Sequence, residues 1–184
     1  MECDVLVLAG LWNSGPQHWQ TLWERKHPGW QRVQHRDWID PECREWVGEL
    51  DAAIASADGG PPILVAHSLS CALVAHWAAS GSVLKVAGAF LVAPSDVEAP
   101  SYPADASSFK PMPMQKLPFP SIVVASSNDP YVSLQRAREF AEAWGSTFVE
   151  IGAAGHINGD SGHGEWPEGE KMLLDFCAAL SKQV

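Results

Sequence analysis

The sequence ILVAHSLSCALVA occupies residues 63–75 and decides the fold. Its first part is apolar and partly β-branched, which indicates a buried strand, and its last part has the small and apolar residues of a closely packed helix. Between them, residues 66–70 match the pattern small-x-Ser-x-small, with Ala66 and Ser70 in place of the glycines of G-x-S-x-G. This pattern is typical of a nucleophile elbow, a strained turn that needs small neighbours where strand and helix approach. It predicts Ser68 as a nucleophile.

Two further polar side chains follow predicted strands later in the chain. Asp129 follows the apolar run at residues 122–125, and His156 lies in a glycine-rich loop after residues 148–151. The carboxyl ends of parallel strands meet at one edge of a sheet, so we expect both residues near Ser68. Their order in the chain, Ser, Asp, His, is the order that accompanies a nucleophile elbow. The sequence therefore predicts His156 as the general base and Asp129 as the residue that orients it.

Other residues compete for these roles. Asp96 also follows a predicted strand and is an alternative acid, and His163 lies close enough in the chain to His156 to be an alternative base. His67 is next to the nucleophile, but its side chain is expected to point away from it and to pack or to line the pocket.

Attack of a serine on a carbonyl carbon also needs backbone N–H donors for the oxyanion that forms. The residue after the nucleophile, Leu69, is the expected first donor, and the loop after the first strand supplies the second. We assign the second donor to Leu11, with Trp12 as the near alternative. Trp12 is also a predicted wall of an apolar pocket, together with His67 and Phe109.

Strand and helix patterns alternate along the whole chain, which predicts an α/β fold. The expected strands lie near residues 5–8, 32–35, 63–66, 87–92, 122–125 and 148–151. Helices are expected from near Pro16 through Trp23, over residues 42–54, after the elbow, over 134–144 and over 172–180. This is a three-layer sandwich, a mainly parallel sheet of about six strands with helices on both faces, in a single domain over residues 1–184. That length leaves no room for a lid domain.

Residues 94–120 are the irregular part of the chain and hold seven of its 14 prolines. Prolines at this density prevent a long helix. The segment is predicted to be either a substrate-binding loop near Phe109 or a plain surface crossover.

Composition excludes several classes of function. The net charge is -10, and the 12 Lys and Arg residues are scattered, so nucleic acid and anionic membranes are not expected partners. The first residues are acidic rather than basic, and no apolar run is long enough for a membrane span. The four cysteines show no metal-binding spacing. We expect a cytoplasmic protein with reduced thiols and without metal or cofactor, and the oligomeric state stays open.

The chain resembles the small, cap-less α/β-hydrolases related to the retinoblastoma-binding serine hydrolase and its bacterial YdeN-like relatives. The motifs that carry the resemblance are LAGLWNS at residues 8–14, HW at 18–19, AHSL at 66–69, SNDPY at 127–131, AGHIN at 154–158 and EWP at 165–167. It implies a Ser-His-Asp hydrolase of small esters or amides. Retinoblastoma binding is not implied, because Pro41 stands where the L-x-C-x-E motif has leucine.

Two functions follow as hypotheses. The first is a serine hydrolase that cleaves small esters, thioesters or amides through an acyl-enzyme on Ser68. The second is a binding or regulatory protein that keeps the hydrolase fold without its chemistry. Labelling by a fluorophosphonate distinguishes them, because it requires an activated serine.

Overall fold

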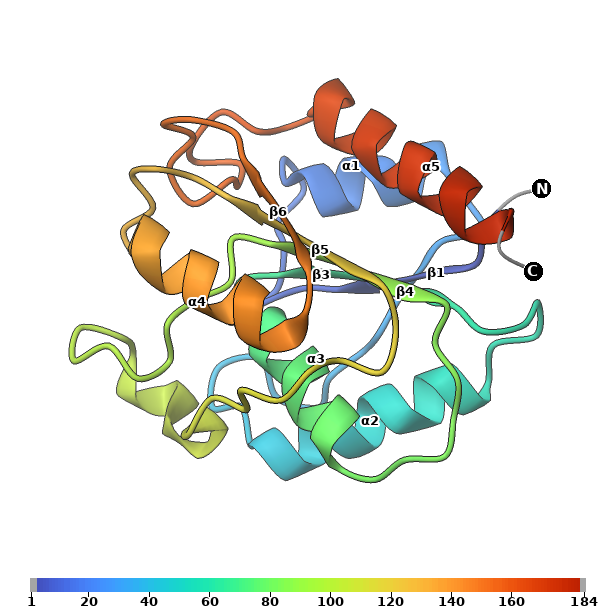
Figure 1. The fold of residues 1–184 in the computed structure, drawn as a ribbon, viewed down its shortest axis with the longest axis horizontal. Helices are drawn as coiled ribbons and strands as arrows, with labels where there is room; N and C mark the ends of the chain where they lie inside the picture. Colours follow the sequence, from blue (N-terminus) through green and yellow to red (C-terminus); the bar gives the residue numbers. More distant parts are fainter. Residues whose placement is uncertain (1–2, 183–184) are drawn as a thin grey trace.

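The computed structural model describes residues 3–182, in which strands and helices alternate (Figure 1). The strands are β1 (Val5–Leu8), β2 (Gln31–Arg32), β3 (Ile63–His67), β4 (Gly88–Val92), β5 (Ser121–Ala125) and β6 (Thr147–Glu150). The helices are α1 (Trp19–Lys26), α2 (Cys43–Ala55), α3 (Leu69–Ala79), the short 3₁₀ helix η1 (Ala104–Phe109), α4 (Leu134–Trp144) and α5 (Pro167–Ser181). All strand pairs are parallel, which confirms the predicted α/β class.

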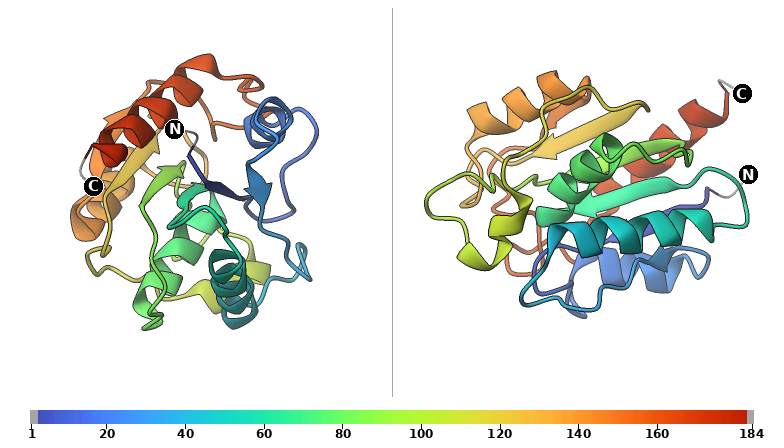
Figure 2. Two further views of the ribbon diagram at one scale, coloured as in Figure 1. Left: turned by 90° about the vertical axis from the view of Figure 1, so that its right-hand side faces the viewer. Right: turned by 90° about the horizontal axis from the view of Figure 1, so that it is seen from below.

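Helices cover both faces of the sheet (Figure 2). Side chains alternate between the faces of a strand, so neighbouring residues of β1 enter different cores. Leu6 and Leu8 belong to the core that also contains buried residues of α2, α3 and α4, whereas Val5 and Val7 belong to the core with residues of α1 and α5. Two apolar cores therefore sandwich the sheet, and strands buried on both faces explain the continuous apolar runs of the sequence.

The strand order is β2-β1-β3-β4-β5-β6. The chain adds β2 on one side of β1 and then returns to place β3 on the other side. The connections after β1 and β3 therefore leave the sheet in opposite directions. At such a switch point the carboxyl ends of the two strands border a crevice, the common ligand site of open parallel sheets. The loop after β1 and the elbow at Ser68 meet there.

Three predicted boundaries differ clearly from the structure. The last helix begins at Pro167 rather than near residue 172, because a proline with its fixed φ suits the first turn of a helix. The second strand is limited to Gln31–Arg32 rather than residues 32–35, because His35 turns away to hydrogen-bond the carboxylate of Glu49 on α2. The first helix begins at Trp19 rather than near Pro16. His18 is the N-cap of this helix and accepts a hydrogen bond from the N–H of Gln20. Residues 16 and 17 therefore form a turn before the helix and are not part of it.

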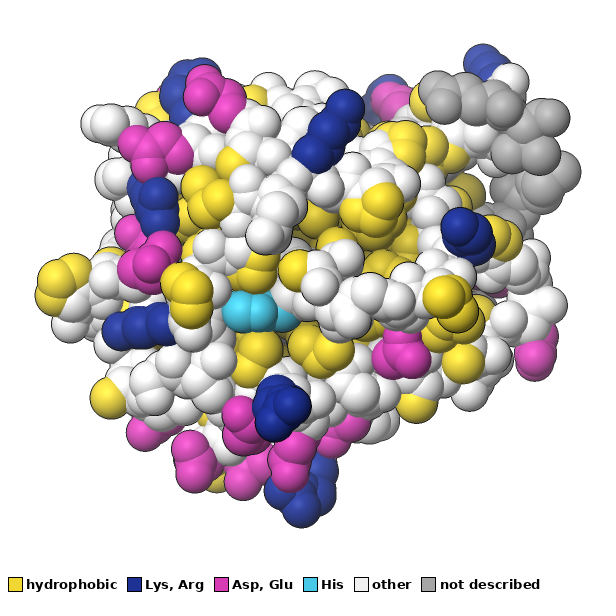
Figure 3. Space-filling view, turned by 60° about the horizontal axis from the view of Figure 1, so that its bottom comes forward, with side chains coloured by type: hydrophobic (Ala, Val, Ile, Leu, Met, Phe, Trp, Pro, Cys, Tyr) yellow, Lys and Arg dark blue, Asp and Glu magenta, His cyan; other side chains and the backbone are white. Residues whose placement is uncertain are grey.

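The face drawn in Figure 3 carries single Lys and Arg side chains among acidic and neutral ones, without a continuous basic area. Within residues 3–182, no helix has the length and apolar character that crossing a bilayer requires.

Candidate active site

Ser68 lies at the tight turn between β3 and α3. Its backbone has φ 59° and ψ -122°, a conformation that costs energy for a residue with a side chain and that the packing around it must maintain. Gly10 provides the space on the side of β1, since a Cβ there would lie 2.9 Å from the Ser68 Cβ and 3.0 Å from the His67 carbonyl oxygen. Ser70 donates a 2.6 Å hydrogen bond to the carbonyl of Ala9. The small residues of the elbow therefore let the β1 loop pack directly against it.

Three loops bring Ser68, His156 and Asp129 together. The distance from His156 Nε2 to Ser68 Oγ is 2.8 Å, and His156 Nδ1 lies 2.9 Å from both carboxylate oxygens of Asp129. The Asp129 side chain is fully buried, and its carboxylate accepts a second hydrogen bond from the N–H of Tyr131. A carboxylate only accepts, so Nδ1 carries the proton of the neutral ring and Nε2 offers a lone pair to the Ser68 hydroxyl.

The loops that carry Asp129 and His156 are joined by residues that the sequence reasoning missed. The Asn128 side-chain oxygen accepts hydrogen bonds from the N–H of Gly155 at 2.7 Å and from the Ser126 hydroxyl at 2.9 Å. Ser126 Oγ also accepts from the N–H of Ala154. These hydrogen bonds fix the loop that carries Asp129 relative to the loop that carries His156. The polar run after β5 was the available signal, because polar residues directly behind a buried strand need partners.

Two backbone N–H groups, one in the β1 loop and one directly after the elbow serine, have no acceptor among residues 3–182. Among residues 3–182, neither Leu11 N–H nor Leu69 N–H has a hydrogen-bond partner. The alternative donor, Trp12 N–H, is occupied, because it donates to the carbonyl of Trp38 at 2.9 Å. Of the two donors considered in the β1 loop, Leu11 is therefore the one that is free.

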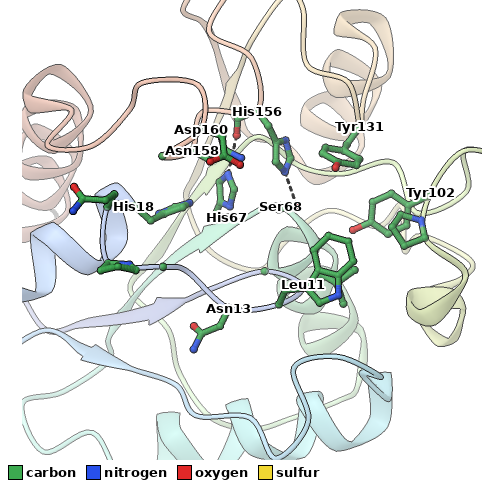
Figure 4. Close-up of a pocket in the computed structure, with 17 residues that line it drawn as sticks. Leu11, Asn13, His18, His67, Ser68, Tyr102, Tyr131, His156, Asn158 and Asp160 are labelled. Carbon is green, nitrogen blue, oxygen red and sulfur yellow. Dashed lines mark hydrogen bonds between the residues drawn. The ribbon is translucent and has the colours of Figure 1, made fainter.

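A cavity of about 560 Å³ opens beside Ser68 (Figure 4). One part of its wall is aromatic, with Trp12, Tyr102 and Tyr131, and the Trp12 side chain is half exposed at the rim. The other part is polar and comprises Asn13, Gln17, His18, His67, Asn158 and Asp160. No Lys or Arg occurs among the described residues of this wall. The cavity therefore has an apolar side and a polar side and carries no positive charge to attract anions.

Two histidines of the wall, His18 and His67, are neutral near pH 7. Burial lowers the pKa of His67 well below its usual value and that of His18 to about 3. His67 Nε2 donates a 2.9 Å hydrogen bond to the carbonyl of His156, so it supports the loop of the predicted base while it borders the cavity. Cys71, one turn into α3, is buried, and burial raises the pKa of its thiol.

The alternative acid and base lie outside this constellation. Asp96 pairs with Arg136 at 3.4 Å and accepts a hydrogen bond from the N–H of Glu98. The His163 ring packs edge to face against Trp166, with 6.0 Å between the ring centroids. Neither Asp96 nor His163 borders the cavity.

The structure does not place Phe109 at the cavity. Its side chain is completely buried against Trp46 of α2, and its carbonyl accepts a hydrogen bond from His76 of α3. The irregular segment of residues 94–120 instead reaches the cavity through Tyr102 and Pro103. The prediction for Phe109 was wrong because an aromatic residue in an irregular segment can serve equally well as a core anchor.

Replacing Phe109 by alanine should therefore reduce stability rather than change substrate choice. A large buried aromatic side chain lost from a core costs about 3–5 kcal/mol. Urea unfolding of Phe109→Ala measures this loss. Met114→Ala in the same segment is the control, since Met114 is exposed and should change the free energy of unfolding by less than about 0.5 kcal/mol. A changed ratio of activities on short and long acyl esters in Phe109→Ala, with stability unaltered, would contradict this placement.

The parallel sheet, its switch point and the serine elbow define an α/β-hydrolase. The chain belongs to the serine hydrolase family, whose profile matches residues 5–175. It is similar to a protein of Pectobacterium atrosepticum described as a YdeN-like hydrolase, with 34% identity, a TM-score of 0.86 and coverage of 97% of this chain and 92% of that one. The predicted resemblance to YdeN-like hydrolases is thus confirmed.

Two more distant structures share the fold. The ydeN gene product of Bacillus subtilis is 19% identical, with a TM-score of 0.78 and coverage of 96% of this chain and 100% of that one. Esterase 2 of Thermogutta terrifontis is 16% identical, with a TM-score of 0.68 and coverage of 97% and 83%. Comparison with the curated proteins found no match. The protein is therefore an enzyme, a serine hydrolase that acts on a small-molecule substrate.

Proposed function

We propose that this hydrolase cleaves small uncharged or weakly polar esters, thioesters or amides through an acyl-enzyme on Ser68, with His156 as base and Asp129 as its orienting partner. The observation that carries the proposal is the continuous contact from Ser68 Oγ through His156 to the buried carboxylate of Asp129, with a 2.8 Å separation between Oγ and Nε2. A serine hydroxyl needs such a base, because it is a weak nucleophile at neutral pH.

The geometry supports the following steps. Ser68 Oγ forms a bond to the carbonyl carbon while its proton moves to His156 Nε2, and the carbonyl electron pair moves onto the oxygen. Leu11 N–H and Leu69 N–H stabilise that oxyanion. Its collapse breaks the bond to the leaving group, which takes the proton from His156. Water then repeats the sequence: it gives a proton to His156 and its oxygen to the acyl carbon, and Ser68 recovers its proton as the acid departs.

The cavity supports the substrate class. Its aromatic wall suits an apolar acyl or leaving group, and Trp12 and His67 are the proposed contacts among the residues named from sequence. Without a Lys or Arg in the described wall, a carboxylate or phosphate on the substrate would lose hydration without gaining an ion pair. The buried cysteines, none in a disulfide among the described residues, support a reducing compartment such as the cytoplasm.

Labelling with a fluorophosphonate tests the proposal. We expect one labelled serine, mapped to Ser68 by peptide analysis, and no labelling of Ser68→Ala. Full labelling of Ser68→Ala would overturn the assignment of the nucleophile. If the folded wild-type protein neither reacts with the probe nor hydrolyses any member of a panel of acyl esters, the binding-protein hypothesis would replace the proposal.

A further inference from the structure

Ser68 Oγ has a second polar partner in addition to His156. Ser95 Oγ lies 2.7 Å from it, and the Ser95 side chain is fully buried. Ser95 follows β4, where the positive φ of 49° at Ala93 turns the chain across the end of the sheet. The Ser95 N–H also faces the Ser68 carbonyl at 3.5 Å, so backbone and side chain both hold this serine against the elbow.

The direction of the bond between the two serines follows from proton counting. Ser68 has one hydroxyl proton, and it is donated to the lone pair of His156 Nε2. Ser68 Oγ can then only accept from Ser95, whose hydroxyl is the donor in the 2.7 Å contact. A hydrogen bond into the nucleophile stabilises negative charge that develops on Oγ.

Tyr102 extends this chain of hydroxyl groups to the cavity wall. Its hydroxyl points toward Ser68 (Figure 4), and both Ser68 and Ser95 interact with it. Burial raises the pKa of Tyr102 to about 12, so the residue is a phenol that can donate a proton. Its ring packs edge to face on Tyr131 at 6.2 Å, and Tyr131 packs in the same way on His156 at 4.6 Å. The orientation of its hydroxyl is therefore coupled to the triad.

We propose that Ser95 is the hydrogen-bond donor that stabilises the nucleophilic oxygen of Ser68, and that Tyr102 positions the Ser95 hydroxyl for this role. The inference rests on the proposed function, since it concerns the same serine. When Ser68 Oγ attacks, it gives its proton to His156 and its electron pair to the carbonyl carbon. The hydrogen bond from the Ser95 hydroxyl to Ser68 Oγ is kept throughout this step. The same contact stabilises Oγ when it leaves the acyl group during deacylation.

The position of Ser95 predicts which kinetic constant changes. Ser95 does not border the cavity, so it makes no contact with bound substrate. Its loss should therefore lower kcat and leave KM nearly unchanged. Removing a hydrogen bond to a group that develops charge should lower the rate by about tenfold or more.

The experiment compares Ser95→Ala with Ser121→Ala. Ser121 also forms a bond between two serine hydroxyls, with Ser146 Oγ at 2.7 Å. It lies at the start of β5, whereas the candidate site lies at the carboxyl ends of the strands. We expect the second-order rate constant for fluorophosphonate labelling and the kcat for an ester to fall about tenfold in Ser95→Ala and less than twofold in Ser121→Ala. Equal rate constants in Ser95→Ala and the wild type would overturn the proposal.

Tyr102→Phe tests the second half and removes only a hydroxyl at the cavity wall. We expect a loss of about threefold in the wild-type background and a clearly smaller loss in Ser95→Ala, because Tyr102 acts mainly through Ser95. An equal loss in both backgrounds would contradict that coupling. If Ser95→Ala does not fold, a wild-type labelling rate in Tyr102→Phe overturns the proposal. Failure of the proposed function gives a different result, since labelling would then survive Ser68→Ala or be absent in the wild type.

Discussion

Replacing His156 by alanine should lower kcat by about 10⁶-fold on any ester that the wild-type enzyme hydrolyses. The physical reason is that His156 Nε2, 2.8 Å from Ser68 Oγ, holds the basic lone pair that takes the serine proton. His67 cannot replace it, because its Nε2 already donates to the His156 carbonyl. Steady-state kinetics on His156→Ala, with folding verified by circular dichroism, provide the measurement.

The matched control is His163→Ala, which changes a histidine in the same loop without touching the cavity. It should keep kcat within about twofold. The pH dependence is a second measurement. Protonation of His156 removes its lone pair, so kcat/KM should fall as the pH decreases. Because burial lowers the pKa of both His18 and His67, neither ring is expected to add an ionisation near neutral pH. A profile that flattens in His163→Ala would assign the base to His163.

The second large effect is expected for Asp129→Asn, with a fall in kcat of about 10⁴-fold. The carboxylate of Asp129 accepts the Nδ1 proton of His156 through two contacts of 2.9 Å. An asparagine can present its N–H₂ to Nδ1 instead. The ring proton then moves to Nε2, which becomes a donor and cannot accept the Ser68 proton. The side chain keeps its size, so the loss should appear in kcat without a change in the melting temperature of more than a few degrees.

Asp96→Asn is the comparison for this variant, since Asp96 was the alternative acid. Its carboxylate pairs with Arg136, whose guanidinium also contacts Glu98 and Glu139, so one lost charge on this surface should cost little. We expect kcat within about twofold of the wild type. A larger loss in Asp96→Asn than in Asp129→Asn, with both proteins folded, would move the orienting role to Asp96.

The elements that sequence reasoning located best are those with a strong local pattern. Residues 63–75 predicted a strand, a turn and a helix, and the structure has β3 ending at His67 and α3 beginning at Leu69. Apolar runs identified the central strands β1, β3, β4 and β5, because a parallel strand between two helix layers must be apolar on both faces. The short β2 was placed less well, since it contributes only two residues to the ladder and has no comparable apolar run.

The residue types of the candidate site were also visible in the sequence. A serine between small residues and an acid and a histidine behind later strands could be named from order alone, because parallel strands bring their carboxyl ends to one edge. The role of these residues remains the proposal that the variants above test.

Other features depend on contacts between segments that are distant in the chain. Trp12 N–H donates a hydrogen bond to the carbonyl of Trp38, which lies between β2 and α2, so Leu11 remains the free donor. Nothing in the local sequence of the β1 loop shows this. Residues 94–120 offered several aromatic side chains, and the helices they meet determine that Phe109 enters the core while Tyr102 reaches Ser68. Sequence by itself therefore determined the fold and the chemical groups along one sheet edge. Tertiary structure alone decided which irregular segments meet that edge, because periodicity specifies the buried side of a strand or helix and not its distant partner.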